Sequence, residues 1–211
     1  MQGAGARLTD MGVETGTRNE RTAGVLLAAG GGSRFDGPAH KLLAQVGGRP
    51  LLEHALASMM AAGLDHVGVV TGAIELGLLL PPGVSALPND RWTEGQATSL
   101  RVAVDWARSL GVTALLVGLG DQPGILARAW RAVAEAVEAP IAVATYADRS
   151  GRGRHRGHPV RLHSSMWELL PSDGDRGAGV VMARFPELVC EVACDGDTSD
   201  VDTVEDLARW R

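Results

Sequence analysis

Residues 24–41, with the sequence GVLLAAGGGSRFDGPAHK, decide the fold that we expect for this chain. The apolar run at 25–29 has the length and composition of a buried strand. Three glycines follow it directly, at 30–32. A strand that runs into a glycine-rich turn leaves several backbone N–H groups unpaired and pointing the same way. The stretch therefore predicts a central strand followed by a seat for phosphate.

Two cations, Arg34 and Lys41, follow the glycines, and we expect both side chains at the surface. Glycine-rich turns with solvated cations also occur in proteins that bind nothing, so this pattern alone leaves both interpretations open. The spacing excludes the two commonest nucleotide loops. A Walker loop needs lysine directly after its last glycine, and the dinucleotide fingerprint needs a glycine where Phe35 stands.

Length and composition fit one α/β domain. The chain has 211 residues, of which 45% are hydrophobic and 4% aromatic, enough for a full core. Strand-like runs at 66–71 and 114–117 alternate with helical patterns, such as the one at 51–60, which predicts a mainly parallel sheet with right-handed crossovers. We expect a three-layer α/β/α domain over residues 23–211. Residues 1–22 are polar and predict a flexible N-terminal extension.

Several classes of protein are disfavoured by the same composition. A net charge of −5 does not suggest general nucleic-acid binding. No apolar run reaches the length of a membrane span, and the N-terminal residues lack the apolar core of a signal peptide. The two cysteines, Cys190 and Cys194, are expected to be free thiols. We therefore expect a cytoplasmic protein without nucleic-acid or membrane partners.

A second strong signal is Asp121, which lies in the tetrapeptide GDQP just after the apolar run 114–117. In an open α/β sheet, ligands collect at the carboxyl ends of the strands. A carboxylate there can hold Mg²⁺ between itself and nucleotide phosphates. An aspartate in a tight turn is more often an Asx-turn residue, but the glycine-rich seat elsewhere in the chain favours the metal.

Three polar segments remain. At 89–100, Thr98 or Ser99 is expected to cap a following helix. At 148–161, arginines among glycines predict a solvated loop or a phosphate-binding one. His158 in that segment could contact a substrate or be a buried, hydrogen-bonded histidine. At 200–207, Thr203 predicts the N-cap of a short helix whose first turn is acidic.

The order of these motifs resembles that of the MobA-like NTP transferases over residues 23–211. Residues 27–41 resemble the signature L-A-A-G-x-S-x-R-M-G-x-x-K, with Gly32 in place of Ser, Phe35 in place of Met and two additional residues before Lys41. GDQP matches the family, and residues 89–100 are similar to N-P-x-W-x-x-G-x-x-x-S-L. Residues 156–160, RGHPV, resemble the molybdenum cofactor cytidylyltransferase branch.

This resemblance implies a Rossmann-like nucleotidyltransferase fold and an Mg²⁺-dependent transfer of NMP from an NTP, in this branch CTP. The acceptor would be a small phosphorylated compound such as molybdopterin, and pyrophosphate would leave. The nucleotide-binding residues it implies are Leu27, Ala28, Ala29, Gly30, Gly31, Gly32, Asn89, Gly95 and Ser99. The catalytic residues are Arg34, Lys41 and Asp121, the metal ligands Asp121 with Asp200 or Asp202, and the acceptor-binding residues Arg156 and His158.

Two alternatives stay open. Family members with the same motifs are named nicotine blue oxidoreductase, which implies NAD(P)H-dependent reduction of a quinone-like dye through a flavin such as FMN, its phosphate held in the glycine-rich seat. The chain has no independent flavin motif, and its carboxylates would then have no clear role. The other alternative is a non-catalytic chaperone that holds the cofactor for a molybdenum hydroxylase. Fold alone does not separate these functions.

Overall fold

The computed structural model describes residues 21–148 and 150–210 of the chain. The expected N-terminal extension lies outside these ranges except for its last two residues, and Arg149 lies outside them as well. The boundary at residue 23 therefore stays a prediction.

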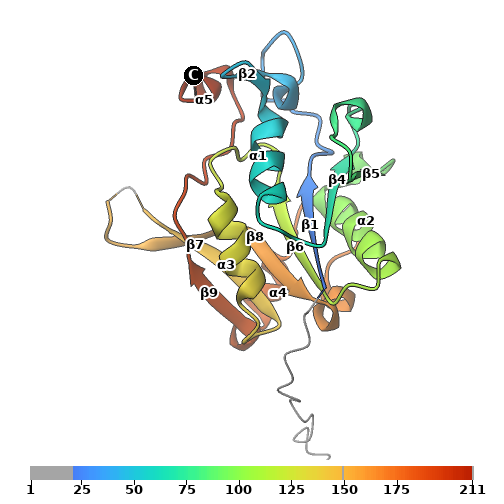
Figure 1. Cartoon of the computed structure of the whole chain (residues 1–211), viewed down its shortest axis with the longest axis vertical. Helices are drawn as coiled ribbons and strands as arrows, with labels where there is room; N and C mark the ends of the chain where they lie inside the picture. The colour runs from blue at the N-terminus through green and yellow to red at the C-terminus, as the bar shows by residue number, and fades with distance from the viewer. Residues whose placement is uncertain (1–20, 149, 211) are drawn as a thin grey trace, which may run out of the picture.

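A seven-stranded sheet forms the centre of the molecule, with the strand order β5-β4-β1-β6-β8-β7-β9 (Figure 1). Its strands are β1 (Thr22–Leu27), β4 (His66–Thr71), β5 (Val84–Pro88), β6 (Ala114–Leu119), β7 (Ile141–Ala147), β8 (Arg154–His163) and β9 (Val189–Ala193). All neighbours pair in parallel except β8, which is antiparallel to both β6 and β7. The sheet is mainly parallel, as predicted.

Helices cover both faces of this sheet. The helices α1 (Leu51–Met60) and α3 (Ala127–Glu135) pack on one face, and α2 (Gln96–Ser109) and α4 (Gly179–Arg184) pack on the other (Figure 1). A two-stranded sheet, β2 (Gln45–Val46) with β3 (Arg49–Pro50), and the short helix α5 (Val204–Ala208) lie at one end. The 3-10 helices are η1 (Lys41–Leu43), η2 (Gly77–Leu79), η3 (Trp92–Glu94), η4 (Ser164–Leu169) and η5 (Pro186–Leu188).

Burial on both faces explains why the central strands are continuously apolar. Successive side chains of a strand point to opposite faces of the sheet. In β1, Val25 packs into the core cluster under α2, whereas Leu26 packs into the cluster under α1 and α3. In β6, Leu115 and Leu116 divide between the same two clusters. A strand covered on both faces cannot alternate with polar residues.

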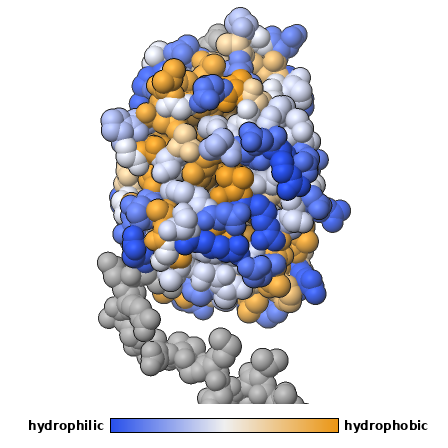
Figure 2. Space-filling model, turned by 90° about the vertical axis from the view of Figure 1, so that its right-hand side faces the viewer, coloured by the Kyte–Doolittle hydropathy of each residue, from blue (hydrophilic) through white to orange (hydrophobic). Residues whose placement is uncertain are grey.

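The surface is mixed. Figure 2 shows apolar side chains in patches bordered by hydrophilic ones on the face that it presents. Leu78, in η2, is 98% exposed. In the described part of the chain, no helix combines the length and the apolar character needed to cross a membrane.

Two expectations about local structure are wrong. In the segment 148–161, residues 154–161 do not form a loop, because β8 begins at Arg154 and pairs along β7. Arg154 is accommodated at the start of the strand because its guanidinium donates hydrogen bonds to the carbonyl oxygens of Thr145 and Cys194. Pairing with a strand that lies elsewhere in the chain therefore overrides the loop-like composition.

The start of α2 also differs from expectation. The helix begins at Gln96 with Gly95 as its N-cap, and Thr98 lies inside the first turn. The Thr98 hydroxyl donates to the carbonyl oxygens of Arg91 and Gly95 at 3.0 and 2.9 Å instead of capping the helix. Gly95 has φ of 109°, and a Cβ there would lie 2.3 Å from the carbonyl carbon of Gly174. Only glycine fits that position.

The close approach of β6 to α3 gives a stability prediction. A Cβ added at Gly118 would lie 2.6 Å from Cζ2 of the buried Trp130 ring. We expect Gly118→Ala to lower the free energy of unfolding by about 1–3 kcal/mol, because the ring has no room to move. Gly179→Ala is the matched control, since a Cβ there meets nothing within 4 Å. Urea unfolding measures both, and equal stability of the two variants would refute the packing argument.

Candidate functional site

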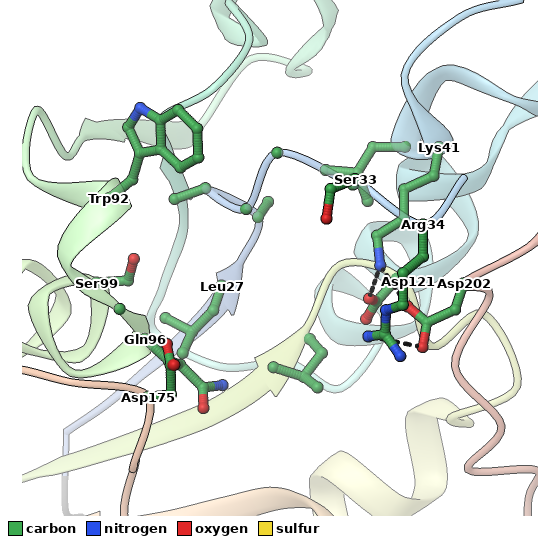
Figure 3. A pocket seen from close by; sticks show the side chains of 18 of the residues that line it. Leu27, Ser33, Arg34, Lys41, Trp92, Gln96, Ser99, Asp121, Asp175 and Asp202 are labelled. Atoms are coloured by element: carbon green, nitrogen blue, oxygen red, sulfur yellow. Dashed lines mark hydrogen bonds and ion pairs between the residues drawn. The ribbon is translucent and has the colours of Figure 1, made fainter. Parts of the chain in front are cut away.

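A cavity of about 580 Å³ lies beyond the carboxyl ends of β1 and β6 (Figure 3). Most residues that the sequence assigned to the site line it. These are Leu27, Ala28, Ala29, Gly30, Gly31, Gly32, Arg34, Lys41, Gly95, Ser99, Asp121 and Asp202. Asn89, Arg156, His158 and Asp200 do not line it. The structure therefore brings the glycine loop, both cations and two of the three predicted carboxylates together.

The glycine loop presents free donors at this cavity. The backbone N–H groups of Gly30, Gly31 and Gly32 donate no hydrogen bond to any residue of the described ranges. Unpaired N–H groups in a concave loop attract anions. Trp92 forms the adjacent wall, and a Cβ at Gly31 would lie 3.2 Å from its indole ring. The loop is thus pressed against the indole and open toward the cavity.

His40 holds the loop to the segment that follows it. Its Nε2 donates to the carbonyl oxygen of Gly30 at 3.0 Å, and its Nδ1 accepts from the backbone N–H of Leu42 at 3.3 Å. Burial lowers the pKa of His40, so the ring is held in this neutral form. His40 is not among the residues predicted from the sequence, although the two additional residues before Lys41 marked its segment as unusual. The bridge shows how the longer loop stays in place.

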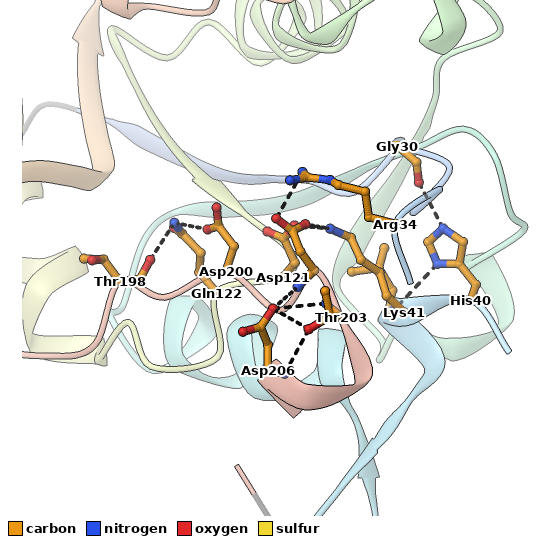
Figure 4. A network of polar contacts seen from close by, with 12 residues as sticks. Gly30, Arg34, His40, Lys41, Asp121, Gln122, Thr198, Asp200, Thr203 and Asp206 are labelled. Atoms are coloured by element: carbon orange, nitrogen blue, oxygen red, sulfur yellow. Dashed lines mark hydrogen bonds and ion pairs between the residues drawn. The ribbon is translucent and has the colours of Figure 1, made fainter. Parts of the chain in front are cut away.

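Lys41, the only lysine of the chain, joins two carboxylates. Its Nζ donates to Oδ2 of Asp121 at 2.6 Å (Figure 4) and to Oδ1 of Asp202 at 3.0 Å. Arg34 adds a second ion pair to Asp202 at 3.0 Å. The side chain of Arg34 is 75% exposed, as expected, but that of Lys41 is only 13% exposed, so the expectation of a surface lysine is wrong. We call these four side chains the ion cluster.

The charge state of Lys41 follows from its neighbours. Burial alone would lower its pKa, but the attraction of Asp121 and the hydrogen bonds to both carboxylates outweigh burial and raise the pKa above 10.5. Lys41 therefore stays protonated at neutral pH. The ammonium compensates the two negative charges that the fold brings together.

The carboxylates fit a divalent metal. Oδ1 of Asp121 is buried and has no hydrogen-bond partner among the described residues. An orphaned carboxylate oxygen of this kind needs an explanation such as an ion. In the described ranges no three or more His, Cys, Asp or Glu side chains are grouped to hold a metal. Two carboxylates nevertheless suit Mg²⁺, which takes its other ligands from water and substrate phosphates.

Asp200 occupies a different position from Asp202. It accepts a hydrogen bond from Nε2 of Gln122 at 2.7 Å, and burial raises its pKa. Asp202, in contrast, shares the Lys41 ammonium with Asp121. Of the two candidates for the second metal carboxylate, Asp202 therefore lies in the better place.

Asn89 supports the site from outside. It is 4% exposed, and its Nδ2 donates to Oγ1 of Thr98 and Oγ of Ser99, both at 2.9 Å. These bonds tie the end of β5 to the first turn of α2. Asn89 thus positions Ser99, which does line the cavity.

Arg156 and His158 line a second cavity of about 290 Å³. It shares Leu27, Gln96 and Leu119 with the first, so the two cavities adjoin. Arg156 already pairs with Glu191 at 2.8 Å. Burial lowers the pKa of His158 to about 4, against a smaller opposing effect of Asp121, so the ring is neutral at pH 7.

Gln96 and Asp175 also line the first cavity, although neither was predicted from the sequence. Gln96 follows Gly95 directly and begins α2. Asp175 reaches the cavity because the carbonyl oxygen of Gly174 accepts from the N–H of Ala97 at 2.9 Å. Gly174 and Ala97 are far apart in the sequence, so no local pattern predicts this hydrogen bond. The position of Gln96 at a helix start beside a glycine was a usable signal.

A parallel sheet with a glycine-rich loop and a carboxylate pair at its carboxyl edge defines a nucleotide-binding α/β protein. The profile of the MobA-like NTP transferase domain matches residues 24–189, which contain the loop and Asp121. This chain belongs to the MobA-like NTP transferase family. Nicotine blue oxidoreductase of Paenarthrobacter nicotinovorans is 33% identical to it over 195 residues, which cover 88% of this chain and 94% of that protein.

Solved structures share the fold. A homologue of Rv0371c from Mycobacterium sp. strain JC1 is 29% identical with a TM-score of 0.76, covering 90% of this chain and 94% of that one. Rv0371c of Mycobacterium tuberculosis H37Rv, in complex with manganese, is 27% identical with a TM-score of 0.73, covering 90% and 97%. A nucleotidyl transferase from Methanothermobacter, 23% identical with a TM-score of 0.74 and covering 90% and 96%, has the same fold.

The ion cluster leads to a prediction about Lys41. Lys41→Met leaves Asp121 and Asp202 facing each other without the ammonium. We expect the free energy of unfolding at pH 7 to fall by about 2 kcal/mol, less than for a fully buried pair because water reaches the cluster. Mn²⁺ should raise the melting temperature of the variant more than that of the wild type, since the metal no longer competes with the ammonium.

Alkaline pH provides the second readout for this variant. The folded-state pKa of Lys41 is raised, so its stabilisation is complete at neutral pH and is lost as the pH rises through that pKa, above 10.5. The stability gap between wild type and variant should close there. Arg91→Met, which breaks an exposed pair with Glu94, is the control and should leave the stability close to that of the wild type, because water screens an exposed pair. Equal stability of Lys41→Met and wild type at pH 7 would contradict this account.

Proposed function

We propose that this protein transfers the NMP group of an NTP, with CTP as the donor, to a small phosphorylated acceptor such as molybdopterin and releases pyrophosphate. One observation carries the proposal: Asp121, whose buried Oδ1 has no hydrogen-bond partner among the described residues, lines the same cavity as the glycine loop 30–32 with its free N–H groups. The cavity has N–H groups that can bind phosphate on one side and a carboxylate that can coordinate a metal on the other. This arrangement suits a triphosphate with a bound metal ion.

The reaction assigns each group a task. An oxygen of the acceptor phosphate forms a bond to the α-phosphorus, and the bond from that phosphorus to pyrophosphate breaks, its electron pair leaving with pyrophosphate. The N–H groups of Gly30, Gly31 and Gly32 orient the phosphates. Arg34 and Lys41 stabilise the negative charge that develops on pyrophosphate. Asp121 and Asp202 would hold Mg²⁺. When bound, the ion would act as a Lewis acid and neutralise negative charge on the phosphates.

The manganese in Rv0371c of M. tuberculosis supports the use of a divalent metal. The near full-length similarity to nicotine blue oxidoreductase favours the second candidate, an NAD(P)H-dependent reduction through FMN. Under that function Asp121 and Asp202 have no task, so we place it second. Mg²⁺ as the metal, a cytoplasmic location and a molybdenum hydroxylase as partner belong to the same proposal.

Parallel assays separate the two functions. The purified protein is offered CTP, GTP or ATP with Mg²⁺ and molybdopterin, and pyrophosphate is measured. Separate samples receive NADH or NADPH with a quinone dye. We expect a colourless protein that releases pyrophosphate with one preferred NTP, because the carboxylates need a metal that bridges phosphates. Flavin absorbance together with magnesium-independent oxidation of NADH would overturn the proposal.

Asp121→Asn tests the metal role directly. The amide keeps the shape of the side chain but removes one charged ligand, so we expect kcat to fall by roughly 10³-fold. Far-UV circular dichroism should show an unchanged fold. Asp105→Asn, at an exposed pair with Arg108, is the control and should keep wild-type turnover. Full magnesium-dependent activity in Asp121→Asn would show that the carboxylate is not a ligand.

A further inference from the structure

The second cavity has mainly apolar walls. Six elements contribute apolar side chains, namely Leu27 from β1, Leu100 from α2, Val117 and Leu119 from β6, Val143 from β7, Val160 from β8 and Met182 from α4. It opens beside the cavity of the ion cluster, with Leu27 and Leu119 common to both. A compact, largely apolar group bound here would therefore lie next to the phosphate site.

His158 brings a polar group to these walls, and its position is held from two sides. Its carbonyl oxygen accepts a hydrogen bond of 2.6 Å from the hydroxyl of the buried Tyr146. Its ring Nδ1 lies 3.1 Å from Oε1 of Gln122. Backbone and ring are thus both fixed before any ligand binds.

The orientation of Gln122 determines which ring nitrogen of His158 carries the proton. Nε2 of Gln122 lies 3.2 Å from the carbonyl oxygen of Thr198 and 2.7 Å from Oδ1 of Asp200 (Figure 4). A backbone carbonyl can only accept, so the NH₂ group of Gln122 must face Thr198. The amide oxygen of Gln122 then faces His158 and can only accept. Nδ1 of His158 is therefore the protonated nitrogen.

A neutral imidazole with its proton on Nδ1 has a bare lone pair on Nε2. Nε2 of His158 makes no hydrogen bond to the parts of the chain that the structure describes, and it is not among their buried unpaired atoms. His158 lines the second cavity. The cavity thus combines mainly apolar walls with a preorganised hydrogen-bond acceptor, Nε2 of His158, besides the polar side chains of Gln96 and Arg156.

We propose that the second cavity binds the body of the acceptor substrate, and that His158 Nε2 selects a compact ring system carrying an N–H or O–H donor. This inference rests on the proposed transferase function and specifies its substrate class. A ring that lacks the donor would leave Nε2 unpaired, which disfavours binding by about tenfold.

Indole and 1-methylindole are suitable probes, because both are compact apolar rings and only indole has an N–H donor. Binding is measured by NMR titration of the free protein, without nucleotide or metal. We expect indole to bind about tenfold more tightly than 1-methylindole. Long-range ¹H–¹⁵N spectra of the wild type should show His158 with a protonated Nδ1 and an unprotonated Nε2.

His158→Asn separates the two ring nitrogens. The asparagine amide can still donate to Gln122 from the place of Nδ1, but it has no atom in the place of Nε2. The preference for indole should therefore disappear, while the affinity for 1-methylindole should stay within about twofold. His163→Asn is the matched control on the same strand. The Nδ1 of His163 caps η4 by accepting from the N–H of Ser165, a role that asparagine can take over, so its preference should remain that of the wild type.

Three results would overturn the inference: a protonated Nε2 in the wild type, equal affinity of the wild type for the two probes, or a preference for indole that persists in His158→Asn. If that variant fails to fold, the tautomer and the probe preference of the wild type decide the matter. These measurements need neither nucleotide nor metal. If the protein prefers indole to 1-methylindole but has no transferase activity, only the proposed function is overturned. If it is an active transferase that binds the two probes equally, only the role of His158 is overturned.

Discussion

The functional site depends on one interaction, the ammonium group of Lys41 between the carboxylates of Asp121 and Asp202. It joins η1, the turn after β6 and the segment before α5, across sequence separations of 80 and 161 residues. Two carboxylates this close repel each other unless a cation lies between them. The same requirement makes the place suitable for a divalent metal. Under the proposed function, the stability of the protein and the binding of a metal depend on the same two carboxylates. The folding of the C-terminal segment, which carries Asp202, would then be linked to the chemistry of the cavity.

The direction of β8 decides where the second cavity lies. β8 runs antiparallel between β6 and β7, whereas the other neighbouring strands of the sheet pair in parallel. The N-terminal half of β8 therefore reaches the edge of the sheet where β6 ends, and His158 comes close to Gln122. The two cavities adjoin as a result, as a reaction between two bound substrates requires.

Adjacent residues after β6 serve the two cavities separately. Asp121 belongs to the ion cluster, and Gln122 links Asp200 to His158 through the two ends of its amide. An amide can do this because it donates at one end and accepts at the other. The tetrapeptide GDQP is thus a connection between the charged site and the apolar cavity. The hydrogen-bond directions along it set the tautomer of a histidine that lies 36 residues away in the sequence.

Local sequence patterns were sufficient to predict the strands, helices and caps that depend only on neighbouring residues. The strand 66–71 and the helix 51–60 formed as predicted, because apolar spacing alone specifies which face is buried. Thr203 caps α5 through a capping box with Asp206, which involves only neighbouring residues. The tertiary structure alone decided that 154–163 is a strand, that Lys41 is largely buried and that Asp202 rather than Asp200 faces Asp121. These outcomes depend on which strands become neighbours, and the order of strands in a sheet brings together residues whose separation along the chain no local pattern records.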